Sequence, residues 1–236
     1  MHPEKLLPTR ILFYIAGLLL MTVGIALSVK SGLGVSPISS VPYTMTCVFG
    51  IEMGLATILF HIFLVLLQIL LLRRRFEWKN LLQIPVGILF GVFTTFSNFL
   101  MTFLPAAENI WLRLSLMLAS TLLIAAGLFF YVPANIVPLA GEGAMLAISG
   151  VTQKPFPTVK MIFDSSMVLF SLLVCLIFLR SLGSVGIGTA GAAILVGSEL
   201  ALLHRIFRPL PTSVPSETAA RQNGSSNPLY QKGLSP

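Results

Sequence analysis

Charged residues are scarce in this sequence: Lys, Arg, Asp and Glu make up 10% of its 236 residues, whereas a soluble domain typically carries about 25%. Hydrophobic residues make up 56%, and the mean hydropathy is +0.92. This composition excludes a water-soluble enzyme domain and a wholly disordered chain. With 2 cysteines and 19 glycines, a disulfide scaffold and a collagen are excluded too. An integral membrane protein is the class that remains.

Enzyme and cofactor motifs are missing as well. The chain contains no Walker motif, no HExxH or GxSxG and no clustered metal ligands. Cys47 and Cys175 fall in different halves without ligand-like spacing. We therefore expect no enzyme activity, no cofactor and no bound metal.

Long apolar runs are what the sequence has in abundance. A bilayer core about 30 Å thick needs about 20 mainly apolar residues in each helix. Six runs fit this length: 11–29, 53–72, 81–107, 114–141, 161–179 and 185–207. We predict an all-α, polytopic membrane protein whose six transmembrane helices form a membrane domain at 11–208 in the lipid bilayer. A short cytoplasmic N-terminus (1–10) and a disordered cytoplasmic tail (209–236), rich in proline, serine and polar residues, flank this domain.

Residues 31–51 are also uncharged and long enough to cross a bilayer. However, Pro37 and Pro42 would break hydrogen bonds in a straight helix, and glycines and hydroxyl residues are frequent. Irregular backbone at membrane depth needs cover from protein or water. We expect a broken, re-entrant or surface-lying segment here, with the sequence leaving these three alternatives open.

The basic residues set the orientation, because cytoplasmic loops carry an excess of Lys and Arg. With six spans and both termini in the cytoplasm, only Lys30, Arg113 and Arg180 of the 15 Lys and Arg face outward. A seventh span at 31–51 would instead place the 73–75 arginine cluster outside. This distribution also accounts for the net charge of +7, so we expect no nucleic-acid partner.

The two halves of the sequence resemble each other. Similar pairs occur in the same order: Gly17-Leu18 and Gly127-Leu128, Gly32-Leu33-Gly34 and Gly141-Glu142-Gly143, Phe60-His61 and Phe163-Asp164, and Gly91 and Gly197. We infer a duplication with repeat one at about 11–104 and repeat two at about 112–208. Because each repeat has an odd number of spans, the second is inverted in the membrane, as in many secondary transporters.

The glycine motifs are candidate binding segments. Gly32 and Gly34 precede Ser36 and Pro37, and such a turn exposes backbone N–H and C=O groups to a small solute or ion. In the second half, the candidates are Gly141, Glu142 and Gly143. The alternative is a tight turn with close helix packing.

Ionisable residues within apolar runs are candidate coupling or ion-binding groups, because they are costly in lipid. Glu199 lies six residues before Arg205; it is either a proton carrier or cation ligand, or a helix-end partner of Arg205 or His204. Asp164 follows Lys160 by four residues, which also suits a simple ion pair.

His61 occupies the place in the first half that Asp164 occupies in the second. Two titratable groups related in this way are expected to face one central path, and histidine titrates near physiological pH. The alternative for His61 is an ordinary hydrogen-bonded histidine in an apolar helix.

Two GxxxG spacings, Gly50 to Gly54 and Gly87 to Gly91, let helices approach closely in lipid. We interpret them mainly as packing sites within one chain, with a homodimer as the lesser alternative.

Three segments together resemble the YczE/YitT-type family of bacterial integral membrane proteins, over roughly residues 10–208: GLLLMTVGIALSVKSGLGVSPIS, VKMIFD and GSVGIGTAGAAILVG. The resemblance implies a multi-span protein of the bacterial inner membrane and supplies no substrate. It adds Gly188 and Thr189, in the Gly186-Ile187-Gly188-Thr189 motif, to the candidate binding residues. The sequence departs from the family pattern at 142–145, where relatives keep a motif containing Gly and Pro.

The leading hypothesis is a small secondary transporter or permease that binds an unknown small solute or ion between two inverted repeats. The first alternative is the substrate-binding membrane subunit of a larger energised complex, which implies a partner subunit. The second is a membrane scaffold that transports nothing.

Overall fold

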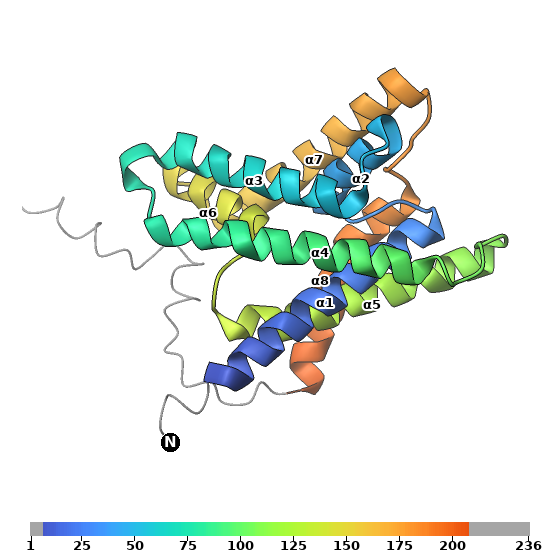
Figure 1. Ribbon diagram of the computed structural model, residues 1–236, viewed down its shortest axis with the longest axis horizontal. Helices are drawn as coiled ribbons and strands as arrows, with labels where there is room; N and C mark the ends of the chain where they lie inside the picture. The colour runs from blue at the N-terminus through green and yellow to red at the C-terminus, as the bar shows by residue number, and fades with distance from the viewer. Residues whose placement is uncertain (1–6, 208–236) are drawn as a thin grey trace, which may run out of the picture.

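The computed structural model describes residues 7–207, which form α-helices and no strand (Figure 1). The helices in this range are α1 (Leu7–Ser31), α2 (Pro37–Phe49), α3 (Met53–Leu72), α4 (Gln83–Met101), α5 (Ile110–Ala134), α6 (Ala140–Thr152), α7 (Phe156–Leu179) and α8 (Ile187–Ile206). Two short 3-10 turns, Arg73–Arg75 and Trp78–Leu82, connect α3 to α4. The predicted tail at 209–236 and the first six residues of the predicted N-terminus lie outside the described residues.

Six helices of the described chain are long and apolar enough to cross a membrane: α1, α3, α4, α5, α7 and α8. The two others, α2 and α6, have 13 residues each and are therefore about 20 Å long, too short to cross a core of about 30 Å. The prediction of an all-α protein with six apolar spans is confirmed, and the segment at 31–51 is not a seventh span.

The fourth predicted apolar span, 114–141, extends too far at its C-terminal end. Helix α5 ends at Ala134 because Asn135 adopts a left-handed conformation with φ of 46°, which ends a helix and tolerates asparagine. Residues 135–139 form a connection, and Gly141 and Gly143 lie in the first turn of α6. These glycines are therefore helical, whereas Gly32 and Gly34 lie in a turn with positive φ.

The order of the helices in the first half recurs in the second. The starts of α1 and α5, of α2 and α6, and of α3 and α7 are each 103 residues apart: Leu7 and Ile110, Pro37 and Ala140, Met53 and Phe156. This spacing keeps His61 matched with Asp164. It matches Gly127 with Gly24 rather than with Gly17, and it matches Gly141 with Ile38 rather than with a glycine.

Helices α1 and α5 pack along their whole length in opposite directions (Figure 1). At one end, the Arg10 guanidinium donates hydrogen bonds of 2.8 and 3.1 Å to the Ala134 carbonyl. In between, a Cβ on Gly17 would lie 2.7 Å from the Gly127 carbonyl oxygen, so both glycines permit the close approach. At the other end, the Ser31 hydroxyl faces Met117.

Each short helix packs against a long helix of the other half: α2 against α7, and α6 against α3 (Figure 1). Buried polar side chains join both pairs. The Ser171 hydroxyl donates to Ser40 at 2.9 Å, and the Gln68 amide donates to Gln83 at 2.8 Å and to the Ala140 carbonyl at 3.2 Å. Because such bonds satisfy groups that lipid cannot, they fix the short helices in place.

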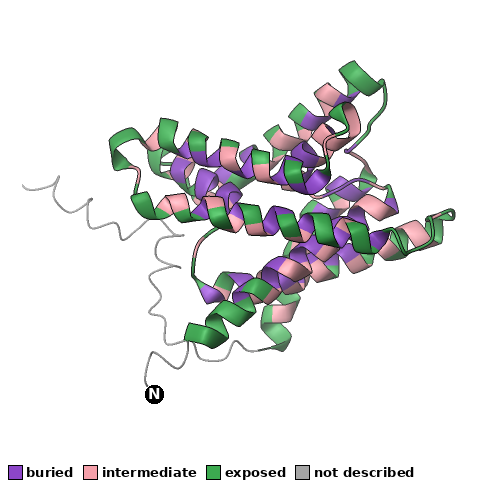
Figure 2. Cartoon of the chain, viewed as in Figure 1, coloured by how far each residue is buried: buried purple, intermediate pink, exposed green. Residues whose placement is uncertain are grey.

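Buried residues follow the inward sides of the helices, and exposed apolar residues follow the outer sides (Figure 2). This pattern suits a protein surrounded by lipid. Helices α7 and α8 are the least buried of the six spans.

Candidate functional site

The first glycine turn contacts the segment before α8. The Gly188 N–H donates to the Leu33 carbonyl at 2.8 Å, and a Cβ on Gly34 would lie 2.6 Å from the Thr189 hydroxyl oxygen. Gly34 has φ of 111°, a conformation that favours glycine. The structure therefore brings Gly34, Gly188 and Thr189 together in a closely packed junction between the two halves.

Gly32, which is exposed, lies beside the Arg113 guanidinium: a Cβ there would be 3.2 Å from its Nη2 atom. The second glycine pair packs elsewhere. Gly141 lies against the Ile38 side chain, and Gly143 lies against the paired amides of Gln68 and Gln83. None of these glycines is among the residues that line the central cavity.

A cavity of about 290 Å³ lies where both short helices begin. Three predicted binding residues line it, Ser36 and Pro37 at the start of α2 and Glu142 in the first turn of α6. Three predicted ionisable residues line it as well, His61, Lys160 and Asp164. The remaining wall is mainly apolar and comes from seven helices, α1 to α6 and α8; it includes Met21, Ile25, Phe60, Phe90, Ile124 and Val196.

His61 is 5% exposed and lines this cavity. Its ring stacks on Phe90 with centroids 5.5 Å apart, and a Cβ on Gly87 would lie 2.8 Å from Nδ1. Nδ1 is buried without a hydrogen-bond partner in the described part of the chain. The alternative of an ordinary hydrogen-bonded histidine is therefore not what the structure has.

Glu142 is held by one tyrosine, Tyr131, and a second tyrosine, Tyr14, bonds the backbone just before α6. The Tyr131 hydroxyl donates to the Glu142 carboxylate at 2.9 Å and accepts from the Leu139 N–H at 2.6 Å. The Tyr14 hydroxyl donates to the Val137 carbonyl at 2.7 Å. Burial raises the pKa of the Glu142 carboxyl, against the smaller opposing effects of the Tyr131 hydrogen bond and the Lys160 charge. The α6 start therefore carries an acid that takes up a proton more readily than a free glutamate.

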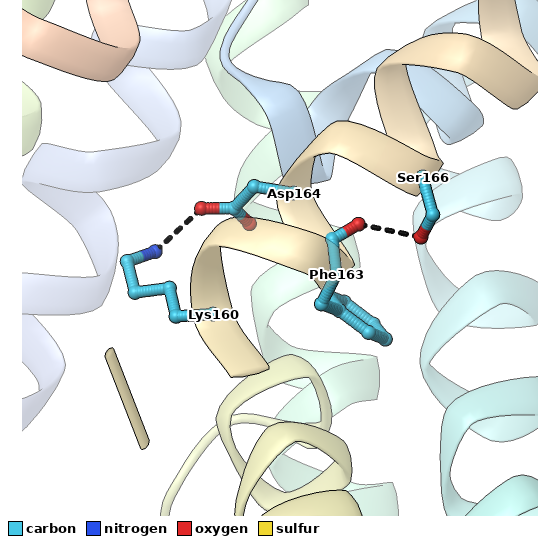
Figure 3. A network of polar contacts seen from close by, with 4 residues as sticks. All are labelled: Lys160, Phe163, Asp164 and Ser166. Carbon is cyan, nitrogen blue, oxygen red and sulfur yellow. Dashed lines mark hydrogen bonds and ion pairs between the residues drawn. The ribbon is translucent and has the colours of Figure 1, made fainter. Parts of the chain in front are cut away.

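Lys160 and Asp164 form an ion pair one turn apart on α7, with Nζ and Oδ2 separated by 2.8 Å (Figure 3). On the same helix the Ser166 hydroxyl donates to the Phe163 carbonyl at 2.7 Å (Figure 3). The simple ion pair is thus present, and it also borders the cavity.

Glu199 does not line the cavity. Its Oε1 accepts a 3.0 Å hydrogen bond from Thr121, and its Oε2 is buried without a partner in the described residues. Within that range neither His204 nor Arg205 pairs with it, and His204 contacts the Leu200 carbonyl instead. The alternative of a helix-end partner for Glu199 is therefore not seen within residues 7–207.

Sequence reasoning missed the amide pair Gln68 and Gln83, each 1% exposed, and Tyr131. An amide within an apolar run was the available signal for Gln68, because a polar group in lipid needs a partner. For metals, residues 7–207 contain no group of three or more His, Cys, Asp or Glu suited to binding an ion.

These observations define an integral, multi-pass membrane protein with a central cavity. Residues 8–205 match the family of unknown function DUF6198, and the chain belongs to this family. No curated protein and no solved structure matches the chain significantly.

Proposed function

We propose that this protein is a small-solute or ion permease of the bacterial inner membrane, with its binding site in the central cavity. One observation carries the proposal: two short helices, one from each half, begin at a cavity lined by a buried, unpaired histidine and by Glu142. Broken helices that meet in this way form the binding sites of many secondary transporters. The resemblance to YczE/YitT-type proteins is consistent with this proposal.

An inverted repeat is part of the proposal. Its support is that α1 and α5, the equivalent first helices, run in opposite directions, and that each short helix packs on the other half. Two units related by an axis in the membrane plane have this arrangement.

The depth of the cavity also supports a transport path. Met21, His61 and Phe90 are near the middle of α1, α3 and α4, and all three line the cavity. If these helices cross the bilayer, the cavity lies near its midplane, where transporter sites are found.

Cysteine accessibility tests the proposal. In a background lacking Cys47 and Cys175, single cysteines at Ser36 and Met145, which both line the cavity, are labelled with a membrane-impermeant thiol reagent in intact cells and in inverted vesicles. We expect both positions to react from both sides, because an alternating cavity opens to each side in turn.

Two exposed positions serve as controls. Under the proposed orientation, a cysteine at Thr102 reacts only from outside and one at Gly150 only from inside. If Ser36 and Met145 also react from one side each, the alternating path is contradicted, and a scaffold or a subunit of an energised complex becomes the better proposal.

A further inference from the structure

The two short helices present different N-termini to the same cavity. In α6, the first turn carries Glu142, so this end has its own negative charge. In α2, the first turn contains no acid, and the Ser36 side chain caps no backbone N–H. The Ser36 hydroxyl instead donates to the Ser39 hydroxyl at 2.9 Å.

A helix N-terminus carries about half a positive charge and free N–H groups, and it favours an anion. At α6 the chain supplies that anion. Helix α2 has 13 residues, enough for a helix dipole. The described chain supplies no anion at its N-terminus, although Ser36, Pro37 and Ser39 line the cavity. Pro37 has no N–H, and the Ser39 N–H already donates to the Ser36 carbonyl at 3.0 Å. What the α2 end offers a negative group is therefore mainly its helix dipole.

His61 is an independent sign of a ligand in this cavity. It is 95% buried, as its 5% exposure shows, and within residues 7–207 it makes a ring contact with Phe90 and no hydrogen bond. Buried polar groups in proteins almost always have a partner. A neutral imidazole donates one N–H. Because Nδ1 lies against Gly87 of α4, the other ring nitrogen, Nε2, is the donor that suits an anionic acceptor in the cavity.

The charges around the cavity leave one acid uncompensated. Lys160 and Asp164 neutralise each other at 2.8 Å, which leaves Glu142. The titratable groups near Glu142 come from four helices: Tyr14 of α1, Tyr131 of α5, His61 of α3, and Lys160 and Asp164 of α7. An ionised Glu142 repels a second anion in the same cavity, whereas a protonated Glu142 does not.

We propose that the cavity binds a small carboxylate with an apolar body, with the N-terminus of α2 and His61 as ligands of the carboxylate, and that Glu142 takes up a proton on binding. The apolar wall of Met21, Ile25, Phe60, Phe90 and Ile124 accommodates the apolar body. This inference rests on the proposed function and names its substrate class. By thermodynamic linkage, the carboxylate binds more tightly at lower pH.

Ligand-induced thermal stabilisation of the purified full chain tests this. The probes are acetate, butyrate and benzoate, with ethylammonium, butylammonium and benzylammonium as size-matched cations, at about pH 5.5 and about pH 7.5, a range in which buried carboxyls titrate. We expect the larger carboxylates to raise the Tm, more strongly at the lower pH, because a ligand that binds the native state stabilises it. If no carboxylate raises the Tm, or if the ammonium ions do so instead, the proposal is wrong.

Three variants test which residues cause the carboxylate-induced rise in Tm and its pH dependence. Glu142→Gln keeps the carboxylate response and loses its pH dependence, whereas Glu199→Gln, the same change at an acid outside the cavity, keeps both. His61→Leu weakens binding, so that the half-saturating carboxylate concentration rises about tenfold or more, as expected for a lost hydrogen bond to a charged group. A pH dependence that survives Glu142→Gln contradicts the role of Glu142.

The cysteine-labelling experiment distinguishes an error in the substrate class from an error in the proposed permease function. If no carboxylate binds while cysteines at Ser36 and Met145 react from both sides, the substrate class is wrong and the permease stands. If carboxylates bind while each position reacts from one side only, the cavity is a binding site without an alternating path.

Discussion

The two helices of the α3–α4 hairpin are in close contact, whereas those of its counterpart, α7 and α8, are apart. We call the first hairpin closed and the second open. In the first, a Cβ on Gly91 would lie 2.7 Å from the Gly54 carbonyl oxygen, so the two backbones are in contact. In the second, the two helices make almost no contact within the described range, and Gly197 has no atom within 4 Å of its Cβ position. Gly197 lines the cavity instead.

The difference has a local cause in the sequence. Close approach in lipid needs small residues on both helices, and Gly54 and Gly91 provide them. At the place that matches Gly54, 103 residues later, α7 has Pro157. Without a pair of glycines, α7 and α8 diverge, and the space between them contributes to the cavity wall.

The closed hairpin is also better capped. Glu52 accepts hydrogen bonds of 2.9 Å from the N–H groups of Gly54 and Leu55, and one of 3.0 Å from the Thr95 hydroxyl of α4. The matching cap of α7 is Pro155, which has no side-chain hydrogen bond. The first hairpin therefore has two stabilising features, the side-chain cap and the backbone contact, that the second lacks within the described residues.

The largest expected effect comes from changing the two glycines that the sequence comparison paired. Gly91→Ala places a methyl group against the α3 backbone and costs about 3 kcal/mol, the upper end for overpacking. Gly197→Ala enters open space and changes stability by about 0.5 kcal/mol or less. Thermal and denaturant unfolding in detergent measure both. Equal losses would contradict the contrast between the hairpins.

Gln68→Leu comes next. It removes the partner of Gln83 and of the Ala140 carbonyl, and a buried group left unpaired costs about 2 kcal/mol. The double variant Gln68→Leu with Gln83→Leu recovers part of this loss, which a double-mutant cycle measures. A strictly additive result would show that the pair is not coupled.

Glu52→Ala removes the cap of α3 and its contact with Thr95. We expect a loss of about 1 kcal/mol, typical for an N-cap. Glu52→Asp is the matched control, because a shorter acid still caps. Since α7 has no side-chain cap to lose, Pro155→Ala should change the free energy of unfolding less than Glu52→Ala does.

Lys160→Met has the smallest expected effect. The Lys160 side chain is 53% exposed, and exposed ion pairs one helical turn apart contribute about 0.5 kcal/mol or less. The same unfolding measurement checks this, at low and high salt. A loss above about 2 kcal/mol would indicate that the pair is structurally essential, as buried pairs are.

The candidate site was predictable in part. His61 and Asp164 were matched by their places in the two halves, and the structure puts both at one cavity. The glycine motifs were less informative: a Gly-x-Gly sequence is compatible with a turn, as at Gly34, and with a helix, as at Gly141. Glu199 lies in an apolar run like the other candidates, but the side of α8 that it occupies does not face the cavity.

The sequence by itself determined the number of spans, their approximate lengths and that the segment at 31–51 is not a straight seventh span. These properties are local, because the free energy of placing a segment in lipid depends on its own side chains. The tertiary structure alone decided that α7 and α8 diverge, that Gly34 contacts Thr189, and that both short helices begin at one cavity. These properties depend on how closely helices far apart in the sequence approach, which shape and hydrogen bonding between side chains control.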